Sequence, residues 1–170
     1  MSFSNLIVDP DEIPRAADVD FKALAPAYPR EVLVNGLLVV VPFVIASLVP
    51  GIIVVKPAAL KAWLFLLPLL PLGLGLILLF LSVKRARLAG YALREHDIVF
   101  RKGLFFRKTV VLPFNRVQHA EVSVGPLQRR FGLASLKLFT AGGSSVDLQI
   151  DGFTREQAEK LRDHITAHGD

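Results

Sequence analysis

Two stretches decide the fold of this chain: VLVNGLLVVVPFVIASLVPGIIVV at residues 32–55 and AWLFLLPLLPLGLGLILLFLSV at residues 62–83. At about 1.5 Å of rise per residue, helices of these lengths reach roughly 36 and 33 Å, enough to cross a hydrocarbon core of about 30 Å. A buried helix of a soluble protein normally keeps a polar face, and these stretches have none. The sequence therefore predicts two membrane-spanning helices. Glycines at Gly36, Gly73 and Gly75 are expected to let them approach closely.

The residues around the spans predict which way this helical hairpin faces. Only six residues, 56–61, separate the spans, so both chain ends lie on the same side of the membrane. The second span is followed directly by three cations, Lys84, Arg85 and Arg87. They outnumber the two lysines of the connecting loop. Because basic flanks stay in the cytoplasm, these topology anchors predict cytoplasmic termini. Neither span contains an ionisable residue, which disfavours ion-coupled transport.

The overall composition is an average over three unlike parts. The 170 residues are 52% hydrophobic and carry a net charge of +5, with a pI of about 9.8. This charge comprises −3 over residues 1–31, +2 over the hairpin and +6 over residues 84–170. The chain has no cysteine, which excludes disulfides, thiol catalysis and cysteine-ligated metals. A basic pI alone is compatible with nucleic-acid binding, but a membrane tether and the lack of a recognised motif predict no nucleic-acid partner.

Residues 1–31 predict an acidic, proline-rich cytoplasmic leader of mostly irregular structure. They contain six acids, three bases and four prolines, and prolines of this kind favour turns and extended chain. Phe21, Leu24 and Tyr28 are its larger apolar side chains near the first span. They are candidates for contact with either the membrane interface or the soluble domain.

Residues 84–170 change to short runs in which apolar and polar residues alternate. This pattern, with Gly or Pro between the runs, predicts an antiparallel sheet with one buried face. The expected strands cover residues 98–101, 105–112, 116–124, 135–138 and 146–150. A terminal amphipathic helix should follow. Thr154 and Gln157 form its capping box, and Ala158, Leu161 and Ile165 lie on one face.

The order of motifs after the hairpin resembles that of bacterial pleckstrin-homology-like (PH-like) membrane proteins of the YdbS-like type. The matching stretches are YALR at 91–94, DIVFRKG at 97–103, LPFNRVQ at 112–118, GPLQRRFGL at 125–133 and TAGG at 140–143. The resemblance covers residues 28–168. It implies an α+β fold, in which a transmembrane hairpin over 32–83 precedes a PH-like antiparallel β-roll over 84–170, capped by a C-terminal helix. It also implies a multi-pass protein of the bacterial cytoplasmic (inner) membrane with an interaction or assembly role, in some members linked to envelope homeostasis.

Basic residues are the main candidates for a binding site. Four cations flank the expected turn at Gly103 and are candidate contacts for anionic lipid: Arg101, Lys102, Arg107 and Lys108. Close to a bilayer, each contributes about 1 kcal/mol of attraction to acidic headgroups. The alternative is a solvated sheet edge that discourages aggregation. Arg129 and Arg130, in the motif at 125–133, are candidate contacts for a partner protein.

Nothing in the sequence predicts catalysis. His164 and His168 have the spacing of a helical metal pair, but no HExxH motif accompanies them. No serine lies in a GxSxG motif, and the resemblance supplies no catalytic residue, so we expect no cofactor, metal or small-molecule substrate. The predicted function is a non-enzymatic, membrane-anchored interaction or assembly module that binds a membrane protein or a second copy of itself. The alternative is a module that binds anionic lipid headgroups.

Overall fold

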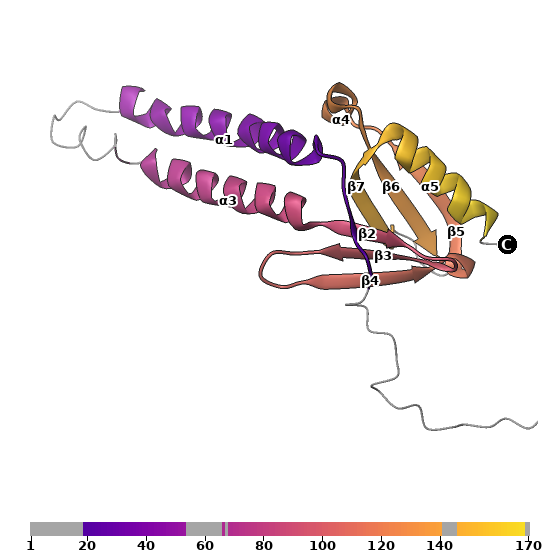
Figure 1. The fold of residues 1–170 in the computed structure, drawn as a ribbon. Coiled ribbons are helices and arrows are strands. Elements are labelled where there is room, and N and C mark those ends of the chain that lie inside the picture. Colours follow the sequence, from indigo (N-terminus) through magenta and orange to yellow (C-terminus); the bar gives the residue numbers. More distant parts are fainter. Residues whose placement is uncertain (1–18, 54–65, 67, 141–145, 169–170) are drawn as a thin grey trace, which may run out of the picture.

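Two long helices lie side by side and lead into a domain of β-strands (Figure 1). The computed structural model describes residues 19–53, 66, 68–140 and 146–168. Helix α1 spans Tyr28–Ile53 and α3 spans Leu69–Leu88, and both are long and apolar enough to cross a membrane. Within their most apolar 18-residue windows, 0% of α1 and 17% of α3 is buried by the protein. Helices so little covered by protein are expected where lipid surrounds them.

Both helices extend beyond the uncharged stretches on the side of the domain. α1 begins at Tyr28, because Pro29 suits the first helical turn, where its missing N–H is not needed. α3 continues to Leu88, with Arg85 and Arg87 in its last turn, where cations complement the helix dipole. The predicted connection at 56–61 and most of the first turns of the second span lie outside the described residues, as does most of the TAGG motif.

Two glycines bring α1 and α3 together. A Cβ atom at Gly36 would overlap the side chain of Leu79, and one at Gly75 would lie 2.8 Å from Cγ1 of Val40. At Gly73, by contrast, an added Cβ would meet no described atom within 4 Å. The expected close approach is therefore confirmed at Gly36 and Gly75, and it is wrong for Gly73.

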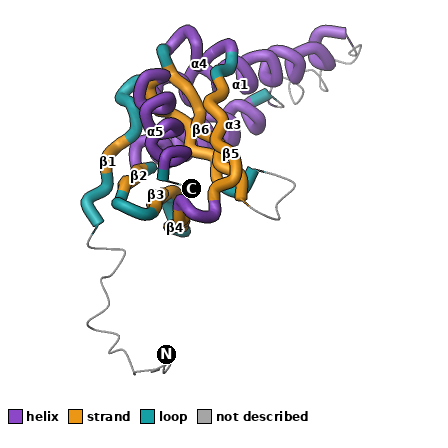
Figure 2. The backbone as a smooth tube through the Cα atoms, turned by 90° about the vertical axis from the view of Figure 1, so that its right-hand side faces the viewer, coloured by secondary structure: helices purple, strands orange, loops and turns teal. Residues whose placement is uncertain are grey.

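In the described part of the chain, seven strands form two antiparallel sheets, which confirms the predicted α+β class. The first sheet runs in the order β1 (Lys22–Ala23), β2 (Gly90–Leu93), β3 (Asp97–Lys102) and β4 (Lys108–Pro113). The second sheet contains β5 (Val117–Ser123), β6 (Leu133–Thr140) and β7 (Leu148–Thr154). The short helix η2 (Phe114–Arg116) joins the two sheets, and α4 (Pro126–Phe131) joins β5 to β6. The terminal helix α5 (Arg155–Ala167) packs on the second sheet (Figure 2).

The core lies between the two sheets and α5. Its most deeply buried large side chains include Ile98, Phe114, Leu136, Ile150, Phe153 and Ile165. The predicted capping box of α5 is confirmed: the hydroxyl of Thr154 accepts a hydrogen bond from the N–H of Gln157 at 3.2 Å, and the side-chain oxygen of Gln157 accepts one from the N–H of Thr154 at 3.1 Å. Its predicted apolar face is buried.

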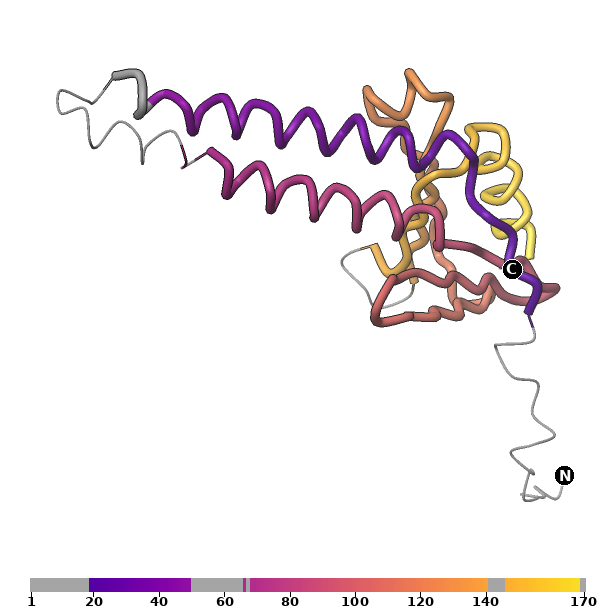
Figure 3. Tube along the Cα trace, turned by 60° about the vertical axis from the view of Figure 1, so that its left-hand side comes forward, coloured from indigo at the N-terminus to yellow at the C-terminus, as the bar shows by residue number. Residues whose placement is uncertain are grey.

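The end of the leader packs on the domain. Residues 19–27 are largely irregular, as expected, but Lys22 pairs with Tyr91 across β1 and β2. Leu24 is buried in the domain core. The Tyr28 ring packs against Gly152, whose φ of +89° and missing side chain make room for it. Figure 3 shows the chain passing along the domain before it enters α1.

Candidate membrane-proximal site

The hairpin between β3 and β4 presents two phenylalanines to solvent. Lys102 pairs with Lys108 at the end of the ladder, so residues 103–107 form the connecting loop. Gly103 has a φ of +117°, and a Cβ atom there would overlap the carbonyl oxygen of Phe106. Only glycine fits such a turn without strain. Phe105 and Phe106 at the tip are 74% and 93% exposed.

This loop corrects the prediction of a strand over residues 105–112. β4 begins only at Lys108, because the chain needs the preceding residues to turn after Gly103. The run FFRKTVVL is apolar enough to suggest a strand that includes both phenylalanines. The ladder instead leaves them outside the sheet, and their side chains contribute nothing to the core.

A groove of about 740 Å³ opens between this hairpin and the ends of the two long helices. Val32 of α1 and Ser82 of α3 line it on one side, and Phe105 and Phe106 line it on the other. Figures 1 and 3 show the tip of the hairpin near the domain-side end of α3, turned toward the side to which the helices extend. The uncharged stretches of the chain begin at Val32 and end one residue after Ser82. The groove therefore adjoins the level at which the apolar spans end.

Among the residues that the structure describes, three cations line the groove: Arg85, Lys102 and Lys108. No ion pair joins any of them to an acid in the described parts of the chain. Asp151 is the single acidic residue among the described residues that line the groove. The lining thus carries an excess of positive charge beside an apolar rim, which suits an anionic, amphiphilic ligand.

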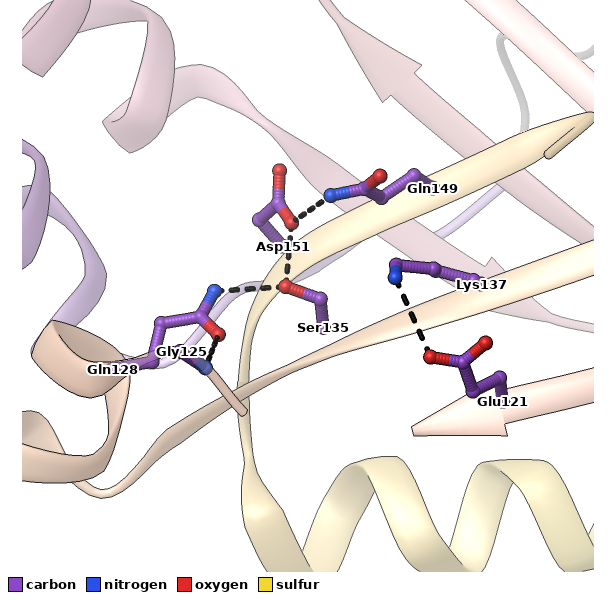
Figure 4. A network of polar contacts seen from close by, with 7 residues as sticks. All are labelled: Glu121, Gly125, Gln128, Ser135, Lys137, Gln149 and Asp151. Carbon is purple, nitrogen blue, oxygen red and sulfur yellow. Dashed lines mark hydrogen bonds and ion pairs between the residues drawn. The ribbon is translucent and has the colours of Figure 1, made fainter. Parts of the chain in front are cut away.

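Asp151 is held on the domain wall by a chain of hydrogen bonds (Figure 4). Its Oδ1 accepts from the Ser135 hydroxyl at 2.6 Å and from the Gln149 amide at 2.8 Å. The Gln128 amide donates to the Ser135 oxygen at 2.8 Å, and its own oxygen accepts from the N–H of Gly125 at 2.9 Å. This network ties α4 to β6 and β7. Asp151 is therefore engaged within the protein and pairs with none of the groove cations.

The four predicted lipid contacts divide between two faces of the hairpin. Lys102 and Lys108 line the groove, whereas Arg101 and Arg107 lie with Leu88 around a separate hollow of about 90 Å³. The guanidinium of Arg101 stacks over the ring of Phe21, 4.0 Å from its centre, a cation–π contact that fixes its position. Arg107 and Lys108 thus line different hollows, although they are adjacent in the sequence.

The three topology anchors also differ in their surroundings. Arg85 lines the groove, whereas the ammonium of Lys84 lies over the ring of Phe80 at 4.6 Å and Arg87 is exposed. Sequence reasoning assigned Arg85 only to topology, and it missed the two exposed phenylalanines. The signal for these was present as an FF pair placed between a glycine and two cations.

The remaining candidates lie away from the groove. Arg129 and Arg130 are exposed in the last turn of α4, a helix that contacts α1 (Figure 2). The rings of His164 and His168 are 4.3 Å apart, and Nδ1 of His168 lies 2.8 Å from the backbone oxygen of His164. Among the described residues, no three potential metal ligands meet.

A second groove, of about 630 Å³, lies between β5 and α5. Gln118 and His119 line it from β5, and Arg162 and Thr166 line it from α5. β5 is an edge strand of its sheet within the described part of the chain. An edge strand offers unpaired backbone N–H and C=O groups to an extended segment.

Known proteins, two of them transmembrane proteins by name, resemble this chain in sequence. Residues 32–168 match the family described as Bacterial PH domain. The UPF0699 transmembrane protein YdbS of Bacillus subtilis (strain 168) is 37% identical over 76 residues, which cover 45% of this chain and 46% of YdbS. The UPF0699 transmembrane protein YdbT of the same organism is 26% identical over 98 residues, which cover 55% of this chain and 20% of YdbT. The chain thus spans less than half the length of these relatives. No solved structure matches it.

Proposed function

The chain belongs to the bacterial PH domain family, and from this premise we propose that it binds anionic lipid headgroups in the groove between α3 and the β3–β4 hairpin. It is a membrane-associated module with a PH-like domain, similar to transmembrane relatives. The observation that carries the proposal is the position of Arg85, Lys102 and Lys108 on the wall of a groove beside the ends of the apolar spans.

Charge and position together favour a lipid headgroup as the ligand. Each of the three cations contributes about 1 kcal/mol of attraction to an anionic membrane surface. The Arg85 guanidinium offers paired donors to a phosphate, and the two lysines offer point charges. Because Val32 and Ser82 line the same groove, a lipid held there keeps its acyl chains beside the helices. This role needs no catalytic residue and no cofactor.

The proposed setting is the bacterial cytoplasmic membrane, with both termini and the PH-like domain in the cytoplasm. The excess of basic residues after the second span supports this orientation. On that side, anionic lipids give the surface a negative potential. The orientation thus places the groove cations where their ligand is most abundant.

The test uses the full chain purified in a neutral detergent. Native mass spectrometry compares bound phosphatidylglycerol with phosphatidylcholine of the same acyl chains. We expect phosphatidylglycerol adducts that disappear in the triple variant Arg85→Gln, Lys102→Gln, Lys108→Gln. The matched control Arg129→Gln, Arg130→Gln, Lys160→Gln removes as much charge and should keep them. Equal binding of both lipids, or adducts that survive the triple substitution, would contradict the proposal.

A second candidate function is the recruitment of a protein, either a membrane protein or another copy of this chain. The observation that favours it is the groove at the edge of β5, because an extended segment can pair with an edge strand and place side chains against α5. The chain has no native cysteine, so Gln118→Cys provides a unique crosslinking site in native membranes. Recovery of monomer alone would count against this function.

A further inference from the structure

We propose that the tip of the β3–β4 hairpin inserts Phe105 and Phe106 into the interface of the bilayer that α1 and α3 span. The tip then forms a third membrane contact, which fixes the orientation of the domain. The proposal goes beyond the charge-based binding of a headgroup, because it concerns apolar burial and applies equally to a neutral membrane.

The exposure of the two rings sets this loop apart from the rest of the domain. Apart from α1, α3 and Leu66 of the second apolar stretch, the other exposed large apolar side chains among the described residues are Leu93, Val111 and Val146, which are 40%, 45% and 36% exposed. Phe105 and Phe106 reach 74% and 93% and are adjacent in sequence. Two neighbouring aromatic rings left in water are unfavourable, and a patch of this kind marks a contact surface.

The position of the loop indicates that the bilayer covers the two exposed rings. Phe105 and Phe106 line the same groove as Ser82 and Arg85, and the uncharged span ends between those two residues of α3, at Val83. The hairpin and the long helices extend toward the same side of the domain (Figures 1 and 3). The tip therefore lies close to the level at which α3 enters the membrane.

The chemistry of the hairpin matches that of an interfacial element. Lys102, Arg107 and Lys108 flank the two rings and are exposed, so they can remain among headgroups while the rings lie deeper. Aromatic rings with adjacent cations are typical of segments at the headgroup boundary. The ladder that ends at the Lys102–Lys108 pair and the turn at Gly103 hold the loop in place. Insertion thus requires no unfolding of the sheet.

Depth-dependent fluorescence quenching tests the insertion in the full chain. The chain has a single tryptophan, Trp63, so Trp63→Phe gives a silent background into which Phe106→Trp is placed. The protein is reconstituted in phosphatidylcholine vesicles whose acyl chains carry bromine near the headgroup or near the bilayer centre. We expect the emission of the Phe106→Trp protein to be blue-shifted. Bromine near the headgroup should quench about half of the emission intensity, because interfacial side chains lie about 5–10 Å into the boundary between headgroups and acyl chains.

Leu93→Trp in the same background is the matched control, since Leu93 lies at the opposite end of the β2–β3 ladder from the tip. It should give unquenched emission. Red-shifted, unquenched emission from the Phe106→Trp protein would overturn the proposal. Blue-shifted emission without bromine quenching would also overturn it, in favour of a protein that covers the tip. The quenching is measured in phosphatidylcholine, which carries no net charge, so the insertion and the headgroup proposal can fail separately.

Discussion

At the residue scale, one glycine allows the start of α1 to dock on the domain. Gly152 lies in β7 with a φ of +89°, and a Cβ atom there would overlap the ring of Tyr28. The backbone oxygen of Gly152 also accepts a hydrogen bond from the N–H of Ala25 at 2.8 Å. A single position thus permits both a close ring contact and a backbone link to the leader.

We expect Gly152→Ala to lower the free energy of unfolding by about 1–3 kcal/mol through backbone strain alone. The added methyl group also displaces the ring of Tyr28, so the total loss should exceed that of strain alone. Thermal unfolding in detergent measures the loss. Gly132→Ala is the matched control: Gly132 also has a positive φ, of +67°, but an added Cβ there meets no described atom within 4 Å. Equal losses in the two variants would mean that the contact with Tyr28 adds no stability.

A second residue-scale prediction concerns the hairpin between β6 and β7. The hydroxyl and the backbone N–H of Thr140 both donate to Oδ2 of Asp147 at 2.7 Å, and these hydrogen bonds lower the pKa of Asp147. The pKa of Asp147 is thus lower in the folded than in the unfolded protein. The ionised carboxylate therefore stabilises the folded state at any pH above the unfolded pKa, and this stabilisation is lost as the pH falls through the folded pKa. Carbon-detected NMR titration should show this low pKa. Thr140→Val should move it back toward the ordinary value for aspartate, and an unchanged pKa would contradict the assignment.

At the scale of elements, local signals predicted α5 well and β4 poorly. Thr154 and Gln157 fix the start of α5 by hydrogen bonds between near neighbours, and its apolar spacing fixes the buried face. The start of β4 depends instead on the Lys102–Lys108 pairing and on the turn at Gly103. An apolar FF pair has the same composition inside a strand and at a loop tip. Only the register of the ladder distinguishes the two.

The pairing of α1 with α3 gives an element-scale prediction. A Cβ atom at Gly75 would lie 2.8 Å from Val40, so Gly75→Val should push the helices apart. Overpacking of this kind costs about 1–3 kcal/mol. Thermal unfolding in detergent should show a lower midpoint for Gly75→Val than for Gly73→Val, because an added Cβ at Gly73 meets no described atom within 4 Å. If both variants melt together, the helices do not rely on this contact.

At the scale of the whole molecule, the sequence could predict the cations of the site but not how they group. Lys102 and Lys108 were expected to act with Arg101 and Arg107, yet the two pairs line separate hollows. Arg85 joins the first pair because the hairpin folds back beside α3, a contact between segments distant in the sequence. The role of Leu24 in the core depends likewise on the leader returning to β2. Such contacts leave no local pattern.

The orientation of the chain in the membrane determines whether the groove cations face the anionic cytoplasmic leaflet. Because the chain lacks cysteine, single cysteines report topology without background. A membrane-impermeant maleimide should label Ala58→Cys, in the connection between the spans, in intact cells. Glu95→Cys, exposed in the turn between β2 and β3, should be labelled only after the membrane is permeabilised. The reverse pattern would contradict the orientation that the basic flanks predict. It would put the groove cations on the outer surface, away from the anionic lipids of the cytoplasmic leaflet.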